Sequence, residues 1–436
     1  MNSVPTPYRL AVAAARAVAP VLARTHSKLG RGMAGRRDAH HLLRRWADAG
    51  RRPEAPLAWF HAPSVGEGLQ ARAVMEALRT LHPNLQVVYT YFSPSAEPLG
   101  ERFGADFAGY LPWDQEPLLG PVLDAVRPDL LVFTKTEVWP VLAAAAHARA
   151  VPVVLAAGTV PPEAGRLRWP ARSVLERTWK SLSGAFACSD DDAGRLRDLG
   201  VPPSAIEVTG DPGIDASAER AGATDSEAGH LAPFLVDPKP TVVAGSTWPA
   251  DEAVLMPALH ALRERLPSLR VVLAPHEPTE DRVGSLIGAF MERGWHPSTL
   301  AHVEADGIVG GVNAIIVERV GVLADLYAVG DLAFVGGGFH DAGLHSVLEP
   351  AAAGLPVVFG PRHRNARAAA ELAEAGAAVV VSDSDETANA LARWLEDSDA
   401  RRYAADEARG YIEKHRGAAQ RTALELSSLM DHLDGP

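Results

Sequence analysis

The chain has 436 residues, a hydrophobic fraction of 47%, a charged fraction of 22% and a formal net charge of −12. Its length favours two domains, its composition is typical of a globular protein, and its negative charge argues against general nucleic-acid binding. The single cysteine, Cys188, excludes an intrachain disulfide, and the sequence has no Cys/His cluster with the ligand spacing of a structural zinc site.

The first 52 residues form a basic arm with a net charge of +9, which leaves −21 for the rest of the chain. Residues 8–23 are rich in Ala, Val and Leu, but Arg9 and Arg16 interrupt them. This segment is shorter than the ~20 apolar residues that span a bilayer, and its charge is spread unlike that of a signal peptide. We expect either a helix that lies on an anionic membrane surface or a solvated basic helix that packs on the protein.

From residue 53 to residue 216, short apolar runs alternate with longer amphipathic segments. The expected strands are 57–62, 85–92, 129–135, 151–158, 184–189 and 205–210, and the expected helices are 69–81, 96–103, 138–149, 169–182 and 190–199. Continuous apolar runs are typical of strands buried on both faces, and the alternation indicates parallel βαβ units. Residues 53–216 are therefore expected to form a first Rossmann-like domain.

Residues 217–240 are rich in Pro, Gly and acidic residues and are expected to form a linker. The alternation resumes in residues 241–436. The expected strands are 240–246, 269–275, 313–318, 331–337, 355–361 and 376–381, and the expected helices are 251–266, 279–293, 323–328, 346–353, 365–375, 385–396 and 400–432. The predicted fold class is α/β, with two doubly wound parallel-sheet domains facing a cleft and ligands at the carboxyl ends of the strands.

Polar or glycine-rich turns follow several of the expected strands, where functional residues usually lie. In the first half these turns contain Ser64, Gly66 and Glu67 after the first strand, and Lys135 and Glu137 after the third. Glu67 opens an amphipathic segment. Its carboxylate either compensates the dipole of a helix or takes a proton from a substrate.

In the second half, Ser246 and Thr247 open a helix, where free backbone N–H groups suit a phosphate, although an ordinary helix cap explains them as well. Three glycines at 336–338 follow a strand and would let a ligand approach the backbone closely. Glu349 could accept ribose hydroxyls or compensate a helix dipole. The sequence has no Walker A motif and no G-x-G-x-x-G fingerprint after the first strand of either half, which argues against a nicotinamide dehydrogenase.

Eight motifs taken in order resemble those of the 3-deoxy-D-manno-octulosonic acid (Kdo) transferases of Gram-negative bacteria. They are HAPSVGE, FSPSAEP, ADFAGYLPWD, KTEVWP, GSTWPADE, APHE, ADLYAVGDLAFVGGGF and GLHSVLEPAAAGLPVVFGP. The resemblance implies a GT-B fold of two Rossmann-like domains. It implies inverting transfer of Kdo from CMP-Kdo to a lipid A precursor, lipid IV-A, in lipopolysaccharide biosynthesis, without a metal or another cofactor. It also implies a peripheral location on the cytoplasmic face of the bacterial inner membrane.

The resemblance carries roles to individual residues. It implies that Glu67 is the general base and that Glu137 stabilises the transition state. Ser64, Gly66 and Lys135, from the same strand-end turns, are expected on the acceptor side or in auxiliary roles. The resemblance assigns to the nucleotide Pro275, His276, Gly321, Val322, Leu323, Ser346, Val347, Leu348 and Glu349, and the strand-end turns add Ser246, Thr247, Gly337 and Gly338.

Three departures from the family pattern bear on catalysis. Gly213 stands where family members usually carry a basic residue, Ser346 replaces an Asn, and the segment AAGTVPPEAG replaces an Arg-containing motif. Lys135, His276, Arg166 or Arg168 would have to supply the missing cation. A GT-B enzyme that uses another nucleotide sugar, and a non-catalytic nucleotide-sugar-binding or membrane scaffold protein, therefore stay open as alternatives.

Overall fold

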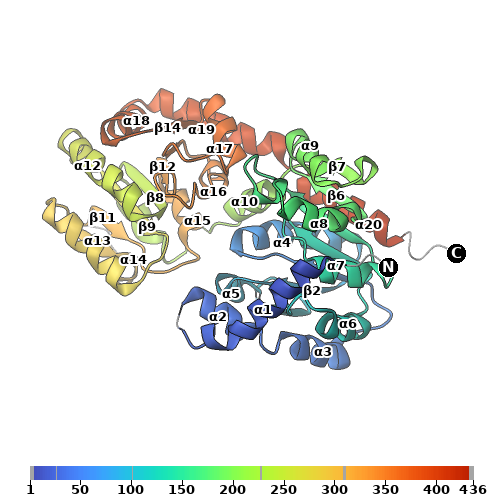
Figure 1. The fold of residues 1–436 in the computed structure, drawn as a ribbon. Helices are drawn as coiled ribbons and strands as arrows, with labels where there is room; N and C mark the ends of the chain where they lie inside the picture. Colours follow the sequence, from blue (N-terminus) through green and yellow to red (C-terminus); the bar gives the residue numbers. More distant parts are fainter. Residues whose placement is uncertain (1–3, 26, 101, 226–227, 308–310, 432–436) are drawn as a thin grey trace. The chain divides into compact units, whose positions relative to one another are not determined.

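The computed structural model describes residues 4–25, 27–100, 102–225, 228–307 and 311–431. It divides the chain into two compact units, the first made of Met1–Ala216 with Gly417–Pro436 and the second of Ser217–Arg416. Each unit contains a seven-stranded sheet with helices on both faces (Figure 1). All strand pairs in both sheets are parallel.

The sheet of the first unit has the order β3-β2-β1-β4-β5-β6-β7. Its strands are β1 (Leu57–His61), β2 (Gln86–Tyr91), β3 (Phe107–Tyr110), β4 (Leu130–Thr134), β5 (Val153–Gly158), β6 (Gly184–Ala187) and β7 (Ile206–Val208). Its helices are α1 (Thr6–Leu22), α2 (Lys28–Gly35), α3 (Ala39–Gly50), α4 (Val65–Leu81), α5 (Glu97–Gly100), α6 (Glu116–Val126), α7 (Pro140–His147), α8 (Ala171–Lys180), α9 (Asp190–Leu199) and α20 (Ala418–Asp431). The short 3-10 turns η1 (Pro94–Ala96), η2 (Gly165–Leu167) and η3 (Pro203–Ala205) complete the unit.

Two cores form on the two faces of this sheet because successive strand residues point to opposite sides. On one face Leu57 and Trp59 pack with residues of α3, α6, α7 and α9. On the other face Ala58 and Phe60 pack with residues of α4 and α20. All five residues of β1 are buried, which is typical of a central strand in a parallel sheet.

The sheet of the second unit has the order β10-β11-β9-β8-β12-β13-β14. Its strands are β8 (Thr241–Thr247), β9 (Arg270–Pro275), β10 (Pro297–Thr299), β11 (Ala314–Ile316), β12 (Leu332–Val335), β13 (Val357–Phe359) and β14 (Ala378–Val380). Its helices are α11 (Ala232–Val236), α12 (Pro249–Arg265), α13 (Glu280–Glu292), α14 (Leu300–Asp306), α15 (Leu323–Leu326), α16 (Leu348–Ala352), α17 (Arg367–Glu374), α18 (Ser384–Glu396) and α19 (Ser398–His415), with the turn η4 (Tyr327–Val329). The helix α10 (Pro212–Gly222) contains the boundary between the units.

The predicted α/β class with two parallel sheets is confirmed, but several elements were not expected. Among them are β3, α6, β10 and α14, together with α11 and the second half of α10 in the expected linker. The strand β3 has four residues and includes Gly109, and β10 has three and begins with a proline, so neither produces an extended apolar run. Both are edge strands, which need less hydrophobic sequence than central ones.

The C-terminal segment differs from the expectation in two ways. The predicted single helix at 400–432 is two helices, α19 and α20, and its last residue, His432, lies outside the described residues. The helix α20 belongs to the first unit, although the sequence pattern placed it in a domain of residues 241–436. Four buried side chains explain the difference, because Ala419, Ala423, Leu426 and Met430 join the core formed by α4.

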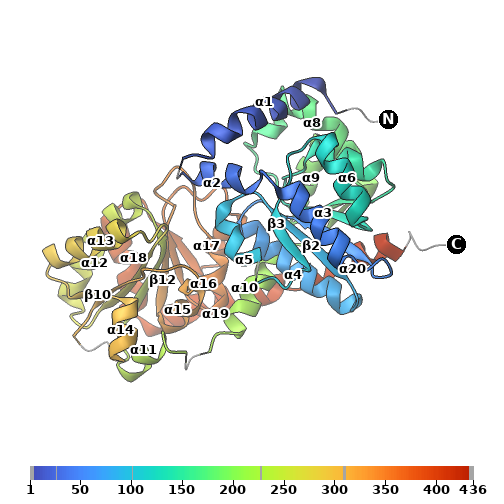
Figure 2. The ribbon, with the colours of Figure 1, turned by 90° about the horizontal axis from the view of Figure 1, so that it is seen from below.

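The basic arm folds into α1, α2 and α3, which Figure 2 shows together in the first unit, with α3 beside β3. The helix α1 covers most of the segment expected to be helical at 8–23. Within the residues that the structure describes, no helix combines the length and the apolar character needed to cross a membrane.

Candidate functional site

The carboxylate of Glu67 lies where β1 passes into α4, beside the end of β4. These two central strands are neighbours, and their connections leave the sheet in different directions, an arrangement that creates a ligand-binding crevice in doubly wound sheets. The Lys135 Nζ lies 3.0 Å from the Glu67 Oε1, and the Glu67 side chain retains 16% of its exposure. The Ser64 hydroxyl donates a hydrogen bond to the other oxygen of this carboxylate.

Local backbone geometry places these groups. Lys135 has a φ of +57°, a left-handed conformation that non-glycine residues rarely adopt and that is found often at functional sites. Gly66 is exposed, and a Cβ built on it would meet no atom within 4 Å. Open space therefore lies next to Glu67 on the first turn of α4. Because Glu67 is in this first turn, the structure is also compatible with helix-dipole compensation.

The second predicted carboxylate, Glu137, lies in the same turn as Lys135. Its Oε1 is 3.6 Å from the Arg166 Nη2, and Arg166 also donates a hydrogen bond to the carbonyl of Thr136. Arg166 comes from η2, after the neighbouring strand β5. The sequence pattern offered Lys135 and Arg166 as substitute cations, and the structure pairs each of them with one of the two predicted carboxylates.

A buried polar cluster ties the basic arm to this turn. Tyr8 of α1 donates a 2.7 Å hydrogen bond to Asp114, and Asp114 accepts bonds from the N–H groups of Val141 and Leu142 at the start of α7. Burial raises the pKa of Asp114, while those hydrogen bonds oppose the shift. The helix α7 begins three residues after Glu137, so the cluster supports the turn that carries this carboxylate.

Arg36 completes the cluster as a buried cation with 2% exposure. It donates hydrogen bonds to the carbonyls of Leu111 and Pro112, and its guanidinium lies 4.5 Å from the ring centre of Trp113 and 5.2 Å from that of Trp139. Such contacts offset the cost of burying a charge. No sequence motif singles out Arg36, because nothing in an arginine-rich arm indicates which arginine is buried.

In the second unit the corresponding position is the junction of β8, β9 and β12. Ser246 has a φ of +55° at the end of β8, and a bulge lies between Gly245 and Thr247. The Trp248 ring stacks on His276 with ring centres 4.5 Å apart, and on His340 at 4.2 Å. These rings form an aromatic platform at the strand ends.

His345 also belongs to the aromatic platform. It accepts a 3.0 Å hydrogen bond from the Trp248 Nε1, and its ring centre lies 4.5 Å from that of His276. Burial, with His276 and His340 nearby, lowers the pKa of His345 to about 4, so its ring is neutral at pH 7. Of these four residues, only His276 was assigned to the nucleotide. The turns at 336–340 and 345–349, which contain His340 and His345, were expected to be functional because they follow a strand. Nothing local indicated that these rings would meet Trp248, because they converge from separate loops.

Three backbone N–H groups around the turn that was expected to hold a phosphate already have an internal partner. The buried Asp251 carboxylate accepts hydrogen bonds from the N–H groups of Trp248, Gly337 and Phe339, at 2.8 to 3.0 Å. The Thr247 hydroxyl likewise donates to the buried Glu252. This part of the turn is therefore an intramolecular anion site, which a second anion could enter only by displacing Asp251.

The glycines at 336–338 also have a structural explanation. A Cβ on Gly336 would lie 2.3 Å from the carbonyl oxygen of Ser246, and one on Gly338 would lie 2.4 Å from the nitrogen of Gly360. Gly337 has a φ of +93°. The triplet is needed for close packing of the ends of three strands, and a role of Gly337 and Gly338 in nucleotide binding stays a prediction.

In the second unit, ionisable side chains interact near both the turn at 321–323 and the segment at 346–349. Asp325 of α15 accepts hydrogen bonds from Arg220, Thr224 and His230. Burial raises the pKa of Glu349, and Arg220 opposes this shift. Arg220 also donates to the carbonyl of Gly321 at 3.4 Å. Arg220 is therefore a cation beside the predicted nucleotide segments. The sequence did not indicate this position, because Arg220 lies in the expected linker.

The predicted residues thus fall into two groups. One contains Ser64, Gly66, Glu67, Lys135 and Glu137 in the first unit, and the other contains the thirteen predicted nucleotide residues in the second. In the second group Pro275, Val347 and Gly337 are buried, whereas Ser246 and His276 are partly exposed and Gly321 and Ser346 are exposed. Across the described ranges, no three His, Cys, Asp or Glu side chains are grouped as metal ligands, and metal independence stays a prediction.

Comparisons with solved structures agree with this architecture. A putative UDP-N-acetylglucosamine 2-epimerase from Listeria monocytogenes matches with a TM-score of 0.60 and 14% identity over 87% of this chain and 97% of that chain. A glycosyltransferase from Rickettsia africae matches with a TM-score of 0.57 and 11% identity over 86% and 99%. At these identities the likeness concerns the fold, and the expected GT-B class is confirmed.

Sequence comparisons are more specific. Residues 39–216 match the family described as 3-deoxy-D-manno-octulosonic-acid transferase (kdotransferase). A 3-deoxy-D-manno-octulosonic acid transferase of Bordetella pertussis is 30% identical over 408 residues, which cover 89% of this chain and 91% of the relative. That of Haemophilus influenzae is 28% identical over 69% of this chain and 70% of the relative. The chain therefore belongs to the Kdo transferase family of glycosyltransferases.

Proposed function

We propose that this protein transfers Kdo from CMP-Kdo to a lipid A precursor of the lipid IV-A type, with inversion at the anomeric carbon. Family membership supports Kdo transfer in lipopolysaccharide biosynthesis. The observation that carries the proposed mechanism is the partly buried Glu67 carboxylate, held by Lys135 and Ser64 beside open space at the end of a central strand.

Glu67 acts as the general base in this proposal. An acceptor hydroxyl gives its proton to the Glu67 carboxylate while its oxygen attacks the anomeric carbon of Kdo. The bond from that carbon to the phosphate of CMP breaks, and CMP leaves with the electron pair. Lys135 and Ser64 hold the carboxylate in one orientation. This positioning lowers the activation barrier, because the reacting atoms must lie close together. Gly66 leaves room for the acceptor.

Glu137 stabilises charge on the sugar as the bond to the phosphate weakens. The ion pair with Arg166 and the cluster around Asp114 hold its turn in place. Arg166 therefore acts as a positioning residue for Glu137 in this scheme.

The second unit binds the nucleotide of the donor. The partly exposed His276 and the aromatic platform offer a flat surface for a base or sugar ring. Arg220, close to Gly321 and Asp325, supplies positive charge beside the segments at 321–323 and 346–349. The proposed acceptor is anionic and membrane-bound, so the +9 charge of the basic arm fits a peripheral position on the cytoplasmic face of the inner membrane.

Incubation of the purified protein with CMP-Kdo and lipid IV-A tests the proposal. We expect a product heavier by one or two Kdo units in mass spectrometry, with release of CMP. Absence of product beside an active family member would reject the donor–acceptor pair. Glu67→Ala separates an enzyme from a scaffold, because an enzyme should lose transfer while CMP binding is kept.

A second candidate is a GT-B enzyme that uses another nucleotide sugar. The observation that favours it is Gly213, which replaces the usual basic residue and whose N–H donates to Asp211. Under this alternative, CMP-Kdo gives no product, and a panel of other nucleotide sugars gives transfer that depends on Glu67.

A further inference from the structure

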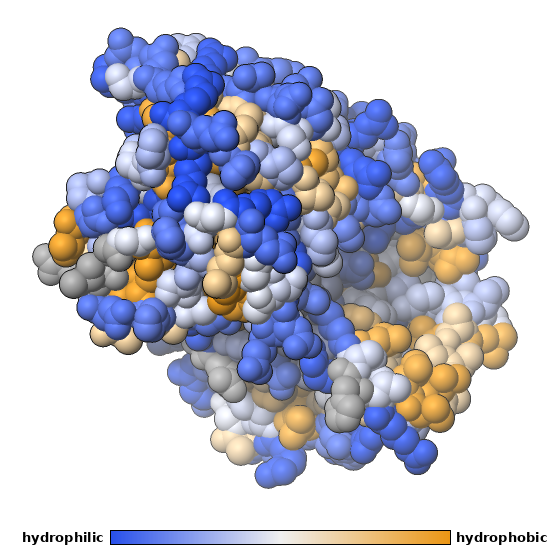
Figure 3. All heavy atoms as spheres, turned by 90° about the vertical axis from the view of Figure 1, so that its left-hand side faces the viewer, coloured by the Kyte–Doolittle hydropathy of each residue, from blue (hydrophilic) through white to orange (hydrophobic). Residues whose placement is uncertain are grey.

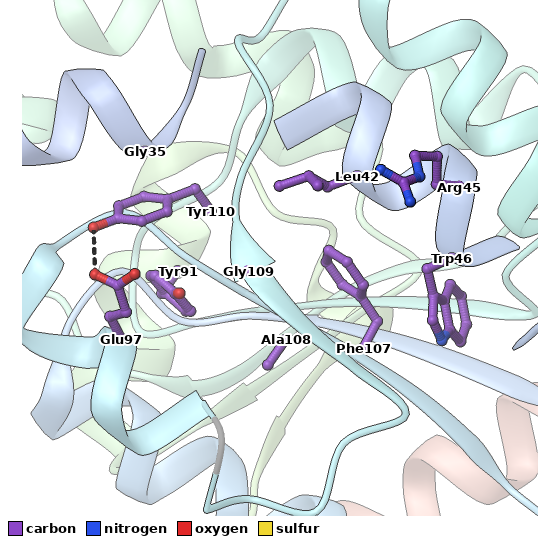
Figure 4. Close-up of a pocket in the computed structure, with 10 residues that line it drawn as sticks. All are labelled: Gly35, Leu42, Arg45, Trp46, Tyr91, Glu97, Phe107, Ala108, Gly109 and Tyr110. Atoms are coloured by element: carbon purple, nitrogen blue, oxygen red, sulfur yellow. Dashed lines mark hydrogen bonds between the residues drawn. The ribbon is translucent and has the colours of Figure 1, made fainter. Parts of the chain in front are cut away.

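A cavity of about 680 Å³ lies in the first unit between α3 and the edge strand β3, and neither Glu67 nor Glu137 is among the residues that line it. Its volume falls within the range of roughly 300–1,000 Å³ that is common for ligand sites. Figure 4 shows the Phe107 ring between Leu42 and Trp46, with Arg45 beside Trp46. The middle of the cavity is therefore apolar and aromatic.

The two ends of the cavity differ in charge. At one end Arg45 is exposed, and within the described part of the chain no carboxylate or other acceptor pairs with it. At the other end the Glu97 carboxylate accepts a 3.3 Å hydrogen bond from the Tyr110 hydroxyl. A ligand with one anionic end and one long apolar part can place the anion at Arg45 and keep it away from Glu97.

The basic arm, which contributes α3 to the cavity, indicates the source of such a ligand. Leu42, which lines the cavity, is 50% exposed, and on the other two helices of the arm Leu29, Val18 and Val21 are exposed by 51–63%. These side chains belong to an arm with a net charge of +9. Apolar residues interspersed with cations are the mark of a surface that meets anionic lipid. Figure 3 shows one face of the molecule on which hydrophobic residues gather next to hydrophilic ones.

We propose that this cavity binds an acyl chain of an anionic lipid, whose phosphate pairs with Arg45 while the chain packs on Leu42, Trp46 and Phe107. The inference extends the proposed function, in which the acceptor is an acylated lipid, but it can be tested without transfer. The chain comes either from that acceptor or from a membrane phospholipid, and both sources offer the same chemistry.

Quenching of Trp46 provides the first test. Lysophosphatidylglycerol with a spin label on its acyl chain, used below its micelle concentration, is titrated into the full-length protein and into Trp46→Phe. The difference between the two quenching curves reports on the cavity. We expect saturable quenching that Leu42→Glu and Arg45→Glu weaken at least tenfold. Arg44→Glu is the matched control, because Arg44 is also exposed on α3 but does not line the cavity.

Absence of a Trp46-dependent difference, or equal effects of Arg45→Glu and Arg44→Glu, would overturn the proposal.

Two further experiments then identify the source of the acyl chain. If the acceptor supplies the chain, Leu42→Glu raises the KM for the acylated acceptor but not for a deacylated one. If a phospholipid supplies it, flotation on phosphatidylglycerol vesicles falls more for Arg45→Glu than for Arg44→Glu, and KM in detergent is unchanged. A wild-type protein that binds the probe but transfers no Kdo would reject the proposed function and leave the cavity assignment standing.

Discussion

At the scale of single residues, Glu67 combines several properties that seldom occur together. It is a carboxylate with 16% exposure, it lies at a strand end between two central strands, and it pairs with Lys135 beside an open space. A carboxylate that only compensates a helix dipole needs neither a paired cation such as Lys135 nor open space beside it. The catalytic and structural interpretations therefore predict different results for an isosteric change.

Glu67→Gln should lower kcat by about 10²- to 10⁴-fold, because the amide cannot accept the proton of the acceptor hydroxyl. The unfolding midpoint should change little, since the amide keeps the size and a hydrogen-bond acceptor for Ser64. Steady-state transfer kinetics and thermal unfolding measure both quantities. Glu76→Gln is the control, because Glu76 lies on the same helix and pairs with Arg72 near the surface. A kcat within twofold of wild type for Glu67→Gln would contradict the role of general base.

A second residue-scale prediction concerns His61, which is buried at the end of β1 and accepts a hydrogen bond from the Trp139 indole. Burial, together with the nearby Arg36, lowers the pKa of His61 to about 3. The unfolded chain binds a proton near pH 6.5 and the folded chain does not, so stability falls as the pH drops from about 6.5 toward 3. The loss approaches about 1.4 kcal/mol per pH unit for one such group.

Denaturation of wild type and His61→Gln at several pH values between 7.5 and 5 tests this linkage. We expect a shallower decline of stability with acidity in the variant, whatever its stability at pH 7.5. His147→Gln should follow the wild-type slope, because His147 is exposed on α7 of the same unit. Parallel curves for wild type and His61→Gln would show that His61 does not carry the effect.

At the scale of elements, the helix α20 connects the end of the chain to the first sheet. Its buried residues pack on α4, the helix that carries Glu67, and the Asp215 carboxylate accepts bonds from the N–H groups of Gly417 and Ala419 at its start. The chain therefore returns to its first unit after completing the second. The support of α4 depends on residues that lie about 350 positions later in the sequence.

Leu426→Ala should destabilise the first unit by about 2–5 kcal/mol, because Leu426 is fully buried against α4 and its removal leaves a cavity. Leu424→Ala should have a much smaller effect, since Leu424 on the same helix is 49% exposed. Hydrogen exchange followed by mass spectrometry locates the loss. Faster exchange in α12 than in α4 would contradict the assignment of α20 to the first unit.

The turns of the second unit show why element type was easier to predict than ligand contacts. The sequence indicated a strand, a glycine-rich turn and a following helix, and all three are present, but Ser246 and Thr247 belong to the end of β8 and the helix α12 begins only at Pro249. The sequence did not indicate that Asp251 would occupy the N–H groups of Trp248, Gly337 and Phe339. Those three donors come from two loops about 90 residues apart, and only folding brings them to one carboxylate.

At the scale of the whole molecule, charge is divided unequally along the chain. The first 52 residues carry +9 and the remainder −21. An anionic surface is attracted to the positive arm and repelled by the negative remainder of the chain. Salt screens the charges and weakens both effects. The proposed peripheral membrane binding through α1 would therefore need both the cations and the exposed apolar side chains of that helix.

Val18→Glu should reduce flotation on phosphatidylglycerol vesicles several-fold, because it removes an apolar contact and adds a negative charge at a site that is 52% exposed. Wild-type flotation should also fall between about 0.05 and 0.3 M salt, as the screening length shortens. Leu235→Glu is the control, since Leu235 is 57% exposed on α11 of the second unit. Equal flotation of the two variants would reject α1 as the membrane contact.

The sequence by itself determined the alternation of strands and helices, the two parallel sheets and the family, because buried parallel strands need continuous apolar runs and the family motifs lie at their ends. It also placed Glu67 after the first expected strand and Lys135 and Glu137 after the third, and the sheet order then made these two strands neighbours. Tertiary structure alone decided the pairing of Glu67 with Lys135, the burial of Arg36, the occupation of the expected phosphate turn by Asp251 and the return of α20 to the first unit. Each of these depends on contacts between segments far apart in the chain, and local patterns carry no information about which partner such a segment will meet.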